Sequence, residues 1–472
     1  MNSKRLSACR PQHRAHSKRL DTQGLAHGFA MKTLDPSSQN TQAFNTEALS
    51  LGQAQQLIGQ CVEDLLQNRS LRTERILLEE AFGRTLAEDI TSAVDVPAHT
   101  NSAMDGFAFR MPPKTNTEPT NMRYKLVGES LAGKPFTKAV AHDECIKIMT
   151  GALLPLELDT VAPFESVMID PLGERTNKLT WGQWIDMDGT RFKAGDNRRL
   201  AGEDIQKGAR VLLQGQRLHA ACMGLMASLG VAQVKVQALL KVAIFSTGDE
   251  LQRPGESLKP GMIFDSNRYT LKGLLQGLGC EVIDLGIAAD EPLALKHMLK
   301  EAAKVCDVII TSGGVSDGDA DHTKAMMQDM GEVFFWKIAM RPGRPLAFGK
   351  IGSSLLFGLP GNPVAVMVTF LSLVRPALLH MMRRQEDPAF DIATLTALCE
   401  EPIRKKPGRT EFQRGLTRRN ANGQLCVRLS GHQGSGILSS MVQADCLIVL
   451  EHERPDIKAQ ETVTLWPLPR LI

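Results

Sequence analysis

The sequence lacks paired cysteines, a strong net charge and a long uninterrupted apolar run. Its nine cysteines are scattered over 472 residues without a C-x-x-C pair, so we expect reduced thiols in a cytoplasmic protein rather than a disulfide framework. The formal net charge of +3 is too small to argue for nucleic acid or a membrane, which usually require basic residues gathered on one face, so we expect neither as a partner. The longest apolar stretch, Leu218 to Val234, is interrupted by His219, Ser228 and Gln233, and therefore predicts a core helix rather than a membrane span.

Residues 1–45 differ from the rest of the chain in composition. Their first part is rich in Lys, Arg and His, holds almost no acid and shows no hydrophobic periodicity, which predicts a disordered basic tail. An Arg-rich, acid-poor opening is also typical of a transit peptide, but no amphipathic stripe is clear. We favour a tail, or a chain that begins in the cell at Met31.

Two separate segments, residues 46–92 and 196–240, are predicted to form one helical and extended linker domain. Apolar residues at three- and four-residue spacing predict helices from Thr46 to Leu86. Arg210–Leu213 and Gln233–Val236 are predicted strands.

Residues 93–195 are predicted to be a small β-rich domain inserted between these two segments. Short apolar runs at Tyr124–Val127, Cys145–Met149 and Lys178–Trp181 are separated by clusters of Gly, Pro and Asn, which is typical of strands and turns.

Residues 241–388 alternate predicted strands with predicted helices. The strands are Val242–Phe245, Glu281–Leu285, Val308–Thr311, Leu346–Phe348 and Ser354–Phe357, and the helices are Ser266–Leu278, Glu291–Ala303, Thr323–Met330 and Pro363–Met381. This rhythm predicts a doubly wound, mostly parallel sheet. Residues 389–472 return to short strands and predict a C-terminal, barrel-like β domain. The chain is thus expected to be a multidomain α/β protein.

Polar motifs follow the predicted parallel strands. The strand at 308–311 ends on Ser312, Gly313 and Gly314, whose backbone N–H groups suit an oxyanion. Asp249 and Glu250 follow the first strand, and Asp290 follows the second. Because ligands bind outside the carboxyl ends of strands in such sheets, these loops are expected to converge.

Nine motifs, in order along the chain, carry a resemblance to a known family. They are NSAMDGFA (101–108), IMTGA (148–152), AGEDI (201–205), FSTGDEL (245–251), FDSNR (264–268), SGGVSDGDADHTK (312–324), RPGRPLAFGK (341–350), GLPGNPVAV (358–366) and GHQGSG (431–436). Together they resemble molybdopterin molybdenumtransferases, a family also present as one part of gephyrin. The resemblance runs from about Leu49 to the end and implies a core domain of the molybdopterin-binding type.

The resemblance implies that molybdate is inserted into the dithiolene of adenylylated molybdopterin, with release of AMP and formation of the molybdenum cofactor. It implies Mg²⁺ as the cofactor, with Asp249, Asp290 and Asp321 as candidate metal ligands and Glu250 beside them. The glycine-rich turn is expected to bind the substrate through Ser312, Gly313, Gly314 and Ser316.

Cations form the second half of the expected site. Lys337, Arg341 and Arg344 follow a strand-like run and suit an oxyanion. The family more often has Lys at the last two positions, so the charge is kept while the hydrogen-bond geometry changes. Arg409 and Ser435 match family positions that face the same oxyanion, whereas the match of Arg414 is weaker.

Asp105 and Thr150, in the inserted domain, complete the list of candidate catalytic residues. The resemblance implies a homodimer in which the inserted domain of one subunit completes the site of the other. A molybdopterin adenylyltransferase is a possible upstream partner.

Structural roles compete with these assignments. Asp105-Gly106 is a common turn pair, Asp249 could cap a helix, and Asp290 is a good N-cap. Some residues also depart from the family pattern: Asp317, Asp319 and His322 in the anion loop, and Thr100, Leu200 and Ala201 elsewhere. Two other functions remain open, namely a molybdopterin adenylyltransferase and a non-catalytic dimeric scaffold.

Overall fold

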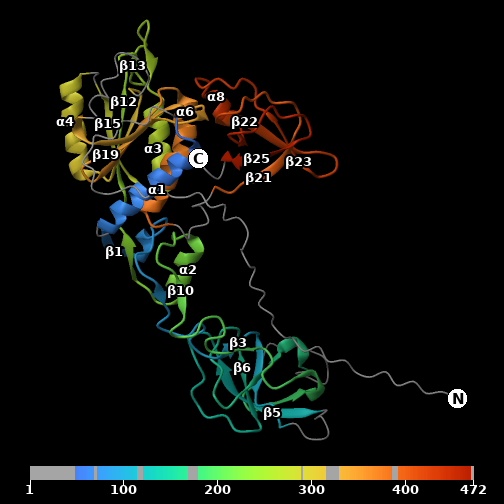
Figure 1. Ribbon diagram of the computed structural model, residues 1–472. Coiled ribbons are helices and arrows are strands. Elements are labelled where there is room, and N and C mark those ends of the chain that lie inside the picture. Colours follow the sequence, from blue (N-terminus) through green and yellow to red (C-terminus); the bar gives the residue numbers. More distant parts are fainter. Residues whose placement is uncertain are drawn as a thin grey trace, which may run out of the picture. The chain divides into compact units, whose positions relative to one another are not determined.

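The computed structural model describes residues 48–68, 72–113, 121–167, 179–288, 291–314, 329–384 and 392–468 (Figure 1). Within these ranges the chain forms two six-stranded sheets, one five-stranded sheet and several two-stranded sheets.

The first helix, α1 (Leu51–Asn68), buries a single stripe of side chains: Ala54, Ile58, Val62 and Leu66. This stripe packs into the core of the α/β sheet described below. The helical prediction for the stretch up to Leu86 is wrong beyond α1, because β1 (Thr73–Leu77) pairs antiparallel with β11 (Gln233–Gln237). That pairing joins residues about 160 positions apart, which local periodicity does not reveal.

The predicted core helix at Leu218–Val234 is shorter than expected. Helix α2 (Ala220–Ser228) buries only Cys222 and Met226, and the chain turns before β11. The remaining strands of this part, β2 (Ile90–Thr91) and β10 (Arg210–Leu212), pair antiparallel.

The inserted domain is a five-stranded sheet in the order β7-β4-β6-β5-β8. Its strands are β4 (Gly106–Phe109), β5 (Met122–Ser130), β6 (Glu144–Ile148), β7 (Thr160–Pro163) and β8 (Trp184–Met187), with β3 (Asn101–Ser102) and β9 (Arg198–Arg199) as a separate pair. The strand prediction at Lys178–Trp181 is wrong. Gly182 has a φ of +91° and sits in a turn, so the strand begins only at Trp184.

The predicted α/β sheet is present, in the order β15-β12-β16-β20-β19-β17. Its strands are β12 (Lys241–Thr247), β15 (Glu281–Ala288), β16 (Val308–Ser312), β17 (Glu332–Lys337), β19 (Pro345–Ile351) and β20 (Ser354–Leu359). The first four strands in the order run parallel, and β19 is antiparallel to both of its neighbours. The prediction of a mostly parallel sheet is therefore confirmed.

Helices cover both faces of this sheet (Figure 1). Helix α3 (Asn267–Leu278) shares a core with Val242, Ile244 and Ile310 on one face, and α4 (Pro292–Val305) shares another with Phe245 and Ile309. The helix predicted at Thr323–Met330 lies mostly outside the described residues.

The helix predicted at Pro363–Met381 is present and deeply buried. Pro363–Met381 is long and apolar enough to cross a membrane, but 89% of its apolar window is buried inside the protein. It consists of α6 (Pro363–Thr369), a π-helical segment (Phe370–Val374) and α7 (Arg375–Met381). Its side chains belong to the core that also contains the stripe of α1.

The C-terminal strands close into a five-stranded barrel, because β22 pairs with both β23 and β24. The strands are β21 (Leu395–Cys399), β22 (Thr410–Arg419), β23 (Leu425–Leu429), β24 (Cys446–Leu450) and β25 (Thr462–Pro467), with α8 (Ser439–Gln443) before β24. Outside the barrel, β18 (Met340–Arg341) adds to β22 in parallel, and β13 (Leu251–Gln252) pairs with β14 (Ile263–Phe264).

Candidate functional site

The carboxyl ends of the parallel strands lie at one edge of the six-stranded α/β sheet. Ser246 of β12 is in register with Ser312 of β16, and Ser312 with Leu359 of β20. The turns after these strands are therefore neighbours, as expected from the sequence. We call this the carboxyl edge.

The glycine-rich turn at this edge requires glycine for steric reasons. Gly313 and Gly314 have φ values of +92° and +67°, which side-chain-bearing residues rarely adopt. A Cβ atom on Gly313 would lie 2.4 Å from the carbonyl oxygen of Thr247. The turn is thus folded tightly against the end of β12.

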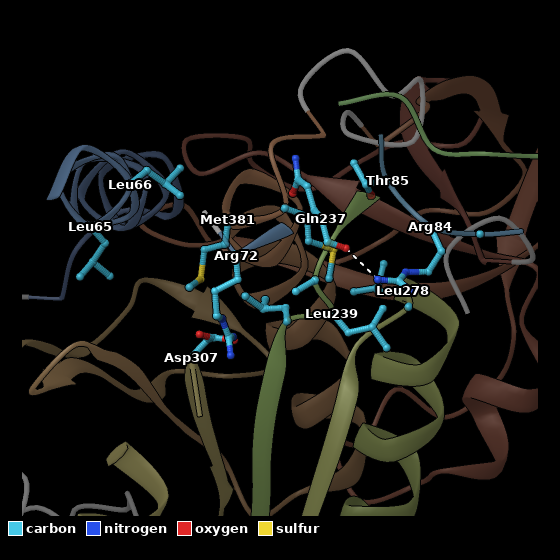
Figure 2. Close-up of a pocket in the computed structure, with 15 residues that line it drawn as sticks. Leu65, Leu66, Arg72, Arg84, Thr85, Gln237, Leu239, Leu278, Asp307 and Met381 are labelled. Atoms are coloured by element: carbon cyan, nitrogen blue, oxygen red, sulfur yellow. Dashed lines mark hydrogen bonds and ion pairs between the residues drawn. The ribbon is translucent and has the colours of Figure 1, made fainter. Parts of the chain in front are cut away.

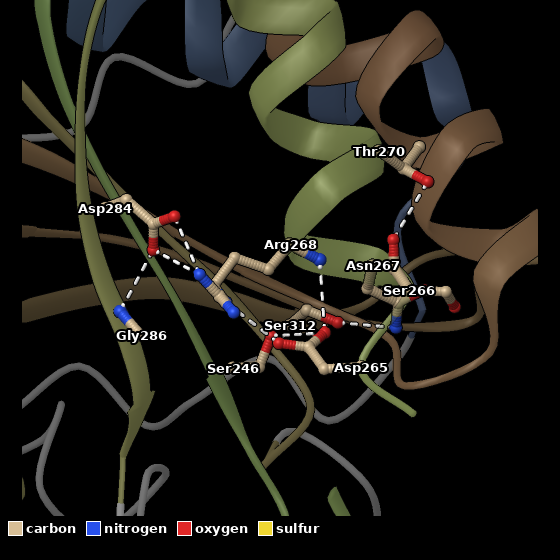
Figure 3. A network of polar contacts seen from close by, with 9 residues as sticks. All are labelled: Ser246, Asp265, Ser266, Asn267, Arg268, Thr270, Asp284, Gly286 and Ser312. Carbon is tan, nitrogen blue, oxygen red and sulfur yellow. Dashed lines mark hydrogen bonds and ion pairs between the residues drawn. The ribbon is translucent and has the colours of Figure 1, made fainter. Parts of the chain in front are cut away.

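Beneath the turn, Asn267 in the first turn of α3 joins two strand ends (Figure 3). Its Nδ2 donates to Ser312 Oγ at 2.7 Å and to the carbonyl oxygen of Gly361 at 2.7 Å. The Asn267 Oδ1 atom is buried without a hydrogen-bond partner among the described residues.

The next residue, Arg268, links α3 to two carboxylates. Its Nε donates to Asp265 Oδ2 at 2.9 Å, and its Nη1 donates to both carboxylate oxygens of Asp284 at 2.8 and 2.7 Å. Asp265, which is only 1% exposed, also accepts from Ser246 Oγ at 3.1 Å. The Arg268 fork therefore connects β15, α3 and the end of β12 (Figure 3).

These contacts favour the charged forms of Arg268 and Asp284. Burial alone would lower the pKa of Arg268, but the hydrogen bonds that it donates to Asp284 and Asp265 raise it overall. Burial works against ionisation of Asp284 as well, yet its hydrogen bonds with Arg268 and the Gly286 N–H lower its pKa overall.

The acidic residues after β12 are exposed at the carboxyl edge. Asp249 and Glu250 lie in the turn before β13, so Asp249 does not cap a helix. A Cβ on Gly248 would lie 2.6 Å from Glu250 Oε2, so this carboxylate folds back over the end of the strand. Asp290, Ser316 and Asp321 lie outside the described residues, and the N-cap of α4 is Glu291 rather than Asp290.

These acids fit Mg²⁺ in chemistry and in number. Within the described ranges no group of three or more His, Cys, Asp or Glu side chains could hold a metal ion. Mg²⁺ is usually bound by one or two carboxylates together with waters and substrate phosphates. Asp249 and Glu250 are exposed carboxylates of this kind, close to the glycine-rich turn.

The predicted cations lie at the same edge, further along the sheet. Strand β19 is antiparallel to both β20 and β17, so β17 runs in the same direction as the parallel strands and ends at the carboxyl edge with Lys337. Lys337 is in register with Pro345, directly after Arg344. Four strand spacings separate β12 from β17, so these two strands lie about 19 Å apart across the sheet.

A buried carboxylate holds two of the predicted arginines. Glu411 of β22 is 2% exposed and accepts from Arg409 Nε at 2.9 Å. The Nη1 atom of Arg341, in β18, lies 3.9 Å from the other oxygen of Glu411. The structure thus brings Arg341 and Arg409 together, whereas the exposed Arg344 makes no side-chain hydrogen bond or ion pair among the described residues.

Arg414 lies in β22, and Ser435 lies in the loop between β23 and α8. The Arg414 side chain is fully buried and donates to the carbonyl oxygens of His432 and Gly434 at 3.1 and 3.0 Å. Burial and the nearby charge of Arg341 lower the pKa of Arg414 to about 10. The Ser435 carbonyl accepts from Val364 N at 3.0 Å, so this loop meets the start of α6 directly after β20.

Asp105 and Thr150 lie together in the inserted domain. The Thr150 backbone N–H and its hydroxyl both donate to Asp105 Oδ1, each at 2.7 Å. These two hydrogen bonds lower the pKa of the exposed Asp105. The pair is anionic at neutral pH.

A separate cavity of about 70 Å³ lies at the opposite, amino-end edge of the sheet (Figure 2). Its polar lining includes Arg72, whose Nη2 donates to Asp307 Oδ2 at 2.6 Å, and Arg84, whose Nη2 donates to the Gln237 carbonyl at 2.8 Å. Leucine and methionine side chains form much of the remaining lining, together with smaller residues such as Gly83, Thr85 and Ala238. None of the predicted site residues lines it.

Sequence reasoning missed two parts of the site. The FDSNR motif was recognised, but no role was assigned to Asn267 or Arg268. Glu411 was also overlooked, although a Glu two residues after Arg409 in a predicted strand would share its face.

The fold and the edge define a multidomain α/β protein whose core sheet presents acids, a glycine turn and cations along one side. Residues 49–230 match the family described as MoeA N-terminal region (domain I and II), 243–380 match the probable molybdopterin binding domain, and 396–468 match the MoeA C-terminal region (domain IV). The chain belongs to the MoeA family.

Known relatives agree with this assignment. A protein of Haemophilus influenzae named molybdopterin molybdenumtransferase is 41% identical over 404 residues, which cover 85% of this chain and 95% of the relative. A protein of the same name from Staphylococcus aureus is 31% identical, over 84% of this chain and 92% of its own. Two crystal structures of a molybdopterin biosynthesis MoeA protein from Pyrococcus horikoshii have TM-scores of 0.70 and 0.72 at 30% and 26% identity, and each covers 89% of this chain and 99% of its own.

Proposed function

We propose that this chain inserts molybdate into adenylylated molybdopterin at the carboxyl edge, releases AMP and so forms the molybdenum cofactor. By its family, the chain is an enzyme of molybdenum cofactor biosynthesis, since it matches relatives named molybdopterin molybdenumtransferase over nearly their whole length. The matches to the N-terminal and C-terminal MoeA regions argue against the alternative of a compact adenylyltransferase.

The observation that carries the proposal is the division of charge along one edge. The acids follow β12 and the cations follow β17 on the same edge, and these two strands lie about 19 Å apart across the sheet, so the two groups would hold different parts of one elongated substrate. The glycine turn after β16 lies between them and offers backbone N–H groups to a phosphate. The arginine side supplies the charge that a small tetrahedral oxyanion such as molybdate needs.

Mg²⁺ would be held by Asp249 and Glu250, with Asp290 and Asp321 as further candidates, and would supply Lewis-acid activation of the phosphate linkage. The chain's own residues bind and orient. Ser312, Gly313 and Gly314 position the phosphate group, and Lys337, Arg341, Arg344, Arg409 and Ser435 are proposed to hold the oxyanion. The sulfur ligands of molybdenum come from the pterin, so the raised pKa of buried thiols such as Cys145 and Cys446 does not impede the reaction.

A homodimer in the cytoplasm is part of the proposal. Asp105 and Thr150 form an exposed anionic pair that would complete the site of the second subunit. A molybdopterin adenylyltransferase would deliver the substrate.

The proposal is tested by measuring AMP release from adenylylated molybdopterin with and without molybdate. We expect release that depends on both molybdate and Mg²⁺. ATP-dependent adenylylation of molybdopterin in the absence of molybdate would instead support the adenylyltransferase. Unchanged cofactor formation by a folded Asp105→Ala variant would remove Asp105 from the site.

A further inference from the structure

The first turn of α3 makes hydrogen bonds to the carboxyl edge in addition to those that cap the helix. Most helix N-termini bind their own backbone through a side-chain cap. Here the residue before the helix, Ser266, makes no such cap hydrogen bond. Asp265 caps the helix in its place, because its Oδ1 accepts from the Arg268 backbone N–H at 3.2 Å. The side chains of Asn267 and Arg268 reach from the same turn towards the strand ends (Figure 3).

Asn267 donates both hydrogens of its side-chain amide to groups at the carboxyl edge. One is donated to Ser312 Oγ, which opens the glycine turn, and the other to the carbonyl of Gly361, in the turn after β20. Ser312 Oγ also approaches the Pro360 carbonyl at 3.4 Å. A single side chain therefore ties together the two turns that lie between the acids and the cations.

Arg268 and Asp265 fix the two strands on the other side. Asp265 accepts from Ser246 of β12, and Arg268 grips Asp284 at the point where β15 bulges before Gly286. Strand β15 leads into the loop that carries Asp290. Asp265, Asn267 and Arg268 together contact the end of β12, strand β15, the turn after β16 and the turn after β20. These are the parallel strands whose following turns the proposed function uses.

The three polar side chains of this arrangement are buried, so they depend on their hydrogen-bond partners. Asp265, Asn267 and Arg268 are 1%, 9% and 8% exposed, and their polar groups are costly to bury unless they are paired. The Asn267 Oδ1 atom has no hydrogen-bond partner among the described residues, so the two hydrogen bonds to Ser312 and Gly361 are the side-chain hydrogen bonds that Asn267 makes there. These two hydrogen bonds connect the turn after β16 with the turn after β20.

We propose that Asn267, supported by the Arg268 fork on Asp265 and Asp284, is a positioning residue that holds the Ser312 turn and the Gly361 turn in the geometry that binds adenylylated molybdopterin. This role rests on the proposed function of the carboxyl edge. Asn267 acts through Ser312 and Gly361 and contacts no reacting atom itself.

The test compares three variants of the full chain. Asn267→Ala removes both hydrogen bonds, and Asn267→Asp keeps the shape of the side chain but removes the donors. Thr270→Ala is the matched control, because Thr270 Oγ1 donates only to Ser266 O within the same helix. For each variant we would measure kcat, KM for adenylylated molybdopterin, the dissociation constant of that substrate by calorimetry, and Tm.

For Asn267→Ala and Asn267→Asp we expect KM and the dissociation constant to rise roughly 10- to 100-fold, since small displacements of positioning groups have effects of this size. The control should keep wild-type values. In an Asn267→Ala, Ser312→Ala double variant, the loss of substrate affinity should be smaller than the sum of the two single losses, because part of the effect of Asn267 passes through its hydrogen bond to Ser312.

A lowered Tm with unchanged KM and unchanged substrate affinity in both Asn267 variants would show a purely structural role and overturn the inference. Failure of the wild-type enzyme to insert molybdate would contradict the proposed function instead. The calorimetric comparison separates these results, because it reports substrate binding without requiring turnover.

Discussion

At the scale of single residues, the proposed oxyanion-binding arginines differ in whether an acidic side chain of the protein pairs with them. Arg409 and Arg341 share the buried Glu411, so part of their charge serves the fold. Arg344 is exposed and makes no ion pair among the described residues, so its charge is available to a ligand. Arginines that look alike in sequence therefore have different tasks.

This difference predicts different effects of substitution. Arg344→Ala should weaken molybdate-dependent AMP release about tenfold or more while leaving Tm unchanged, because only an exposed cation is lost. Arg409→Ala should lower activity and also the free energy of unfolding, by about 1–3 kcal/mol, because Glu411 keeps only the longer contact with Arg341. Thermal melts alongside the assay check both results, and equal losses of Tm in the two variants would contradict the distinction.

The Arg268–Asp284 pair predicts a pH dependence of stability. The pKa of Asp284 is lowered in the folded chain, so the pair's contribution is fully present above the unfolded pKa of about 3.9 and is lost as the pH falls through the folded value. Asp284→Asn should lower Tm at pH 7 and flatten the dependence of Tm on pH between about 5 and 2. Melting curves across that range measure both effects, and parallel wild-type and variant profiles would contradict the role of this pair.

At the scale of elements, the sequence revealed what depends on local pattern. The strands and helices around β12, α3, β16 and β20 were predicted because apolar runs and glycine turns mark them directly. β1 was taken as helix, since only its pairing with β11 makes it a strand. The contacts of Asn267 with Ser312 and Gly361 were not predicted because they join elements distant in sequence, and nothing in the local pattern of FDSNR specifies these partners. The same holds for the contact between Glu411 and Arg341. The pair of Glu411 with Arg409 is local and was overlooked.

The turn after β16 provides a prediction for an element. Gly313→Ala would place a Cβ 2.4 Å from Thr247 O at a φ of +92°, so the turn must move and substrate affinity should fall at least about tenfold, with a loss of more than about 1 kcal/mol in stability. Gly273→Ala in α3 is the control, because a Cβ there meets nothing within 4 Å and should stabilise the helix by about 0.5–1 kcal/mol. Substrate titrations and melts compare the two variants. Wild-type affinity in Gly313→Ala would show that the turn does not contact the substrate.

At the scale of the whole molecule, the proposed site draws on both ends of the chain. The sheet supplies the acids and the glycine turn, and the barrel joins the same core through Phe412 and Trp466 while placing Arg409 beside Arg341. The inserted domain contributes the Asp105–Thr150 pair. The extra domains therefore make physical sense as parts of one site, provided that the inserted domain acts on a second subunit.

Mixed dimers test that condition directly. Asp105→Ala and Arg344→Ala should each be nearly inactive as homodimers, but when the two are co-expressed half of the dimers are mixed, and each mixed dimer has one site with both residues intact. About a quarter of wild-type activity should then return if subunits pair at random. Light scattering would confirm that every sample is dimeric. The control is a mixture of Arg341→Ala and Arg344→Ala subunits, because both substitutions fall on the same side of the site and should not complement each other. Activity that stays at the level of the two homodimers in the Asp105→Ala and Arg344→Ala mixture would mean that each subunit builds its site alone.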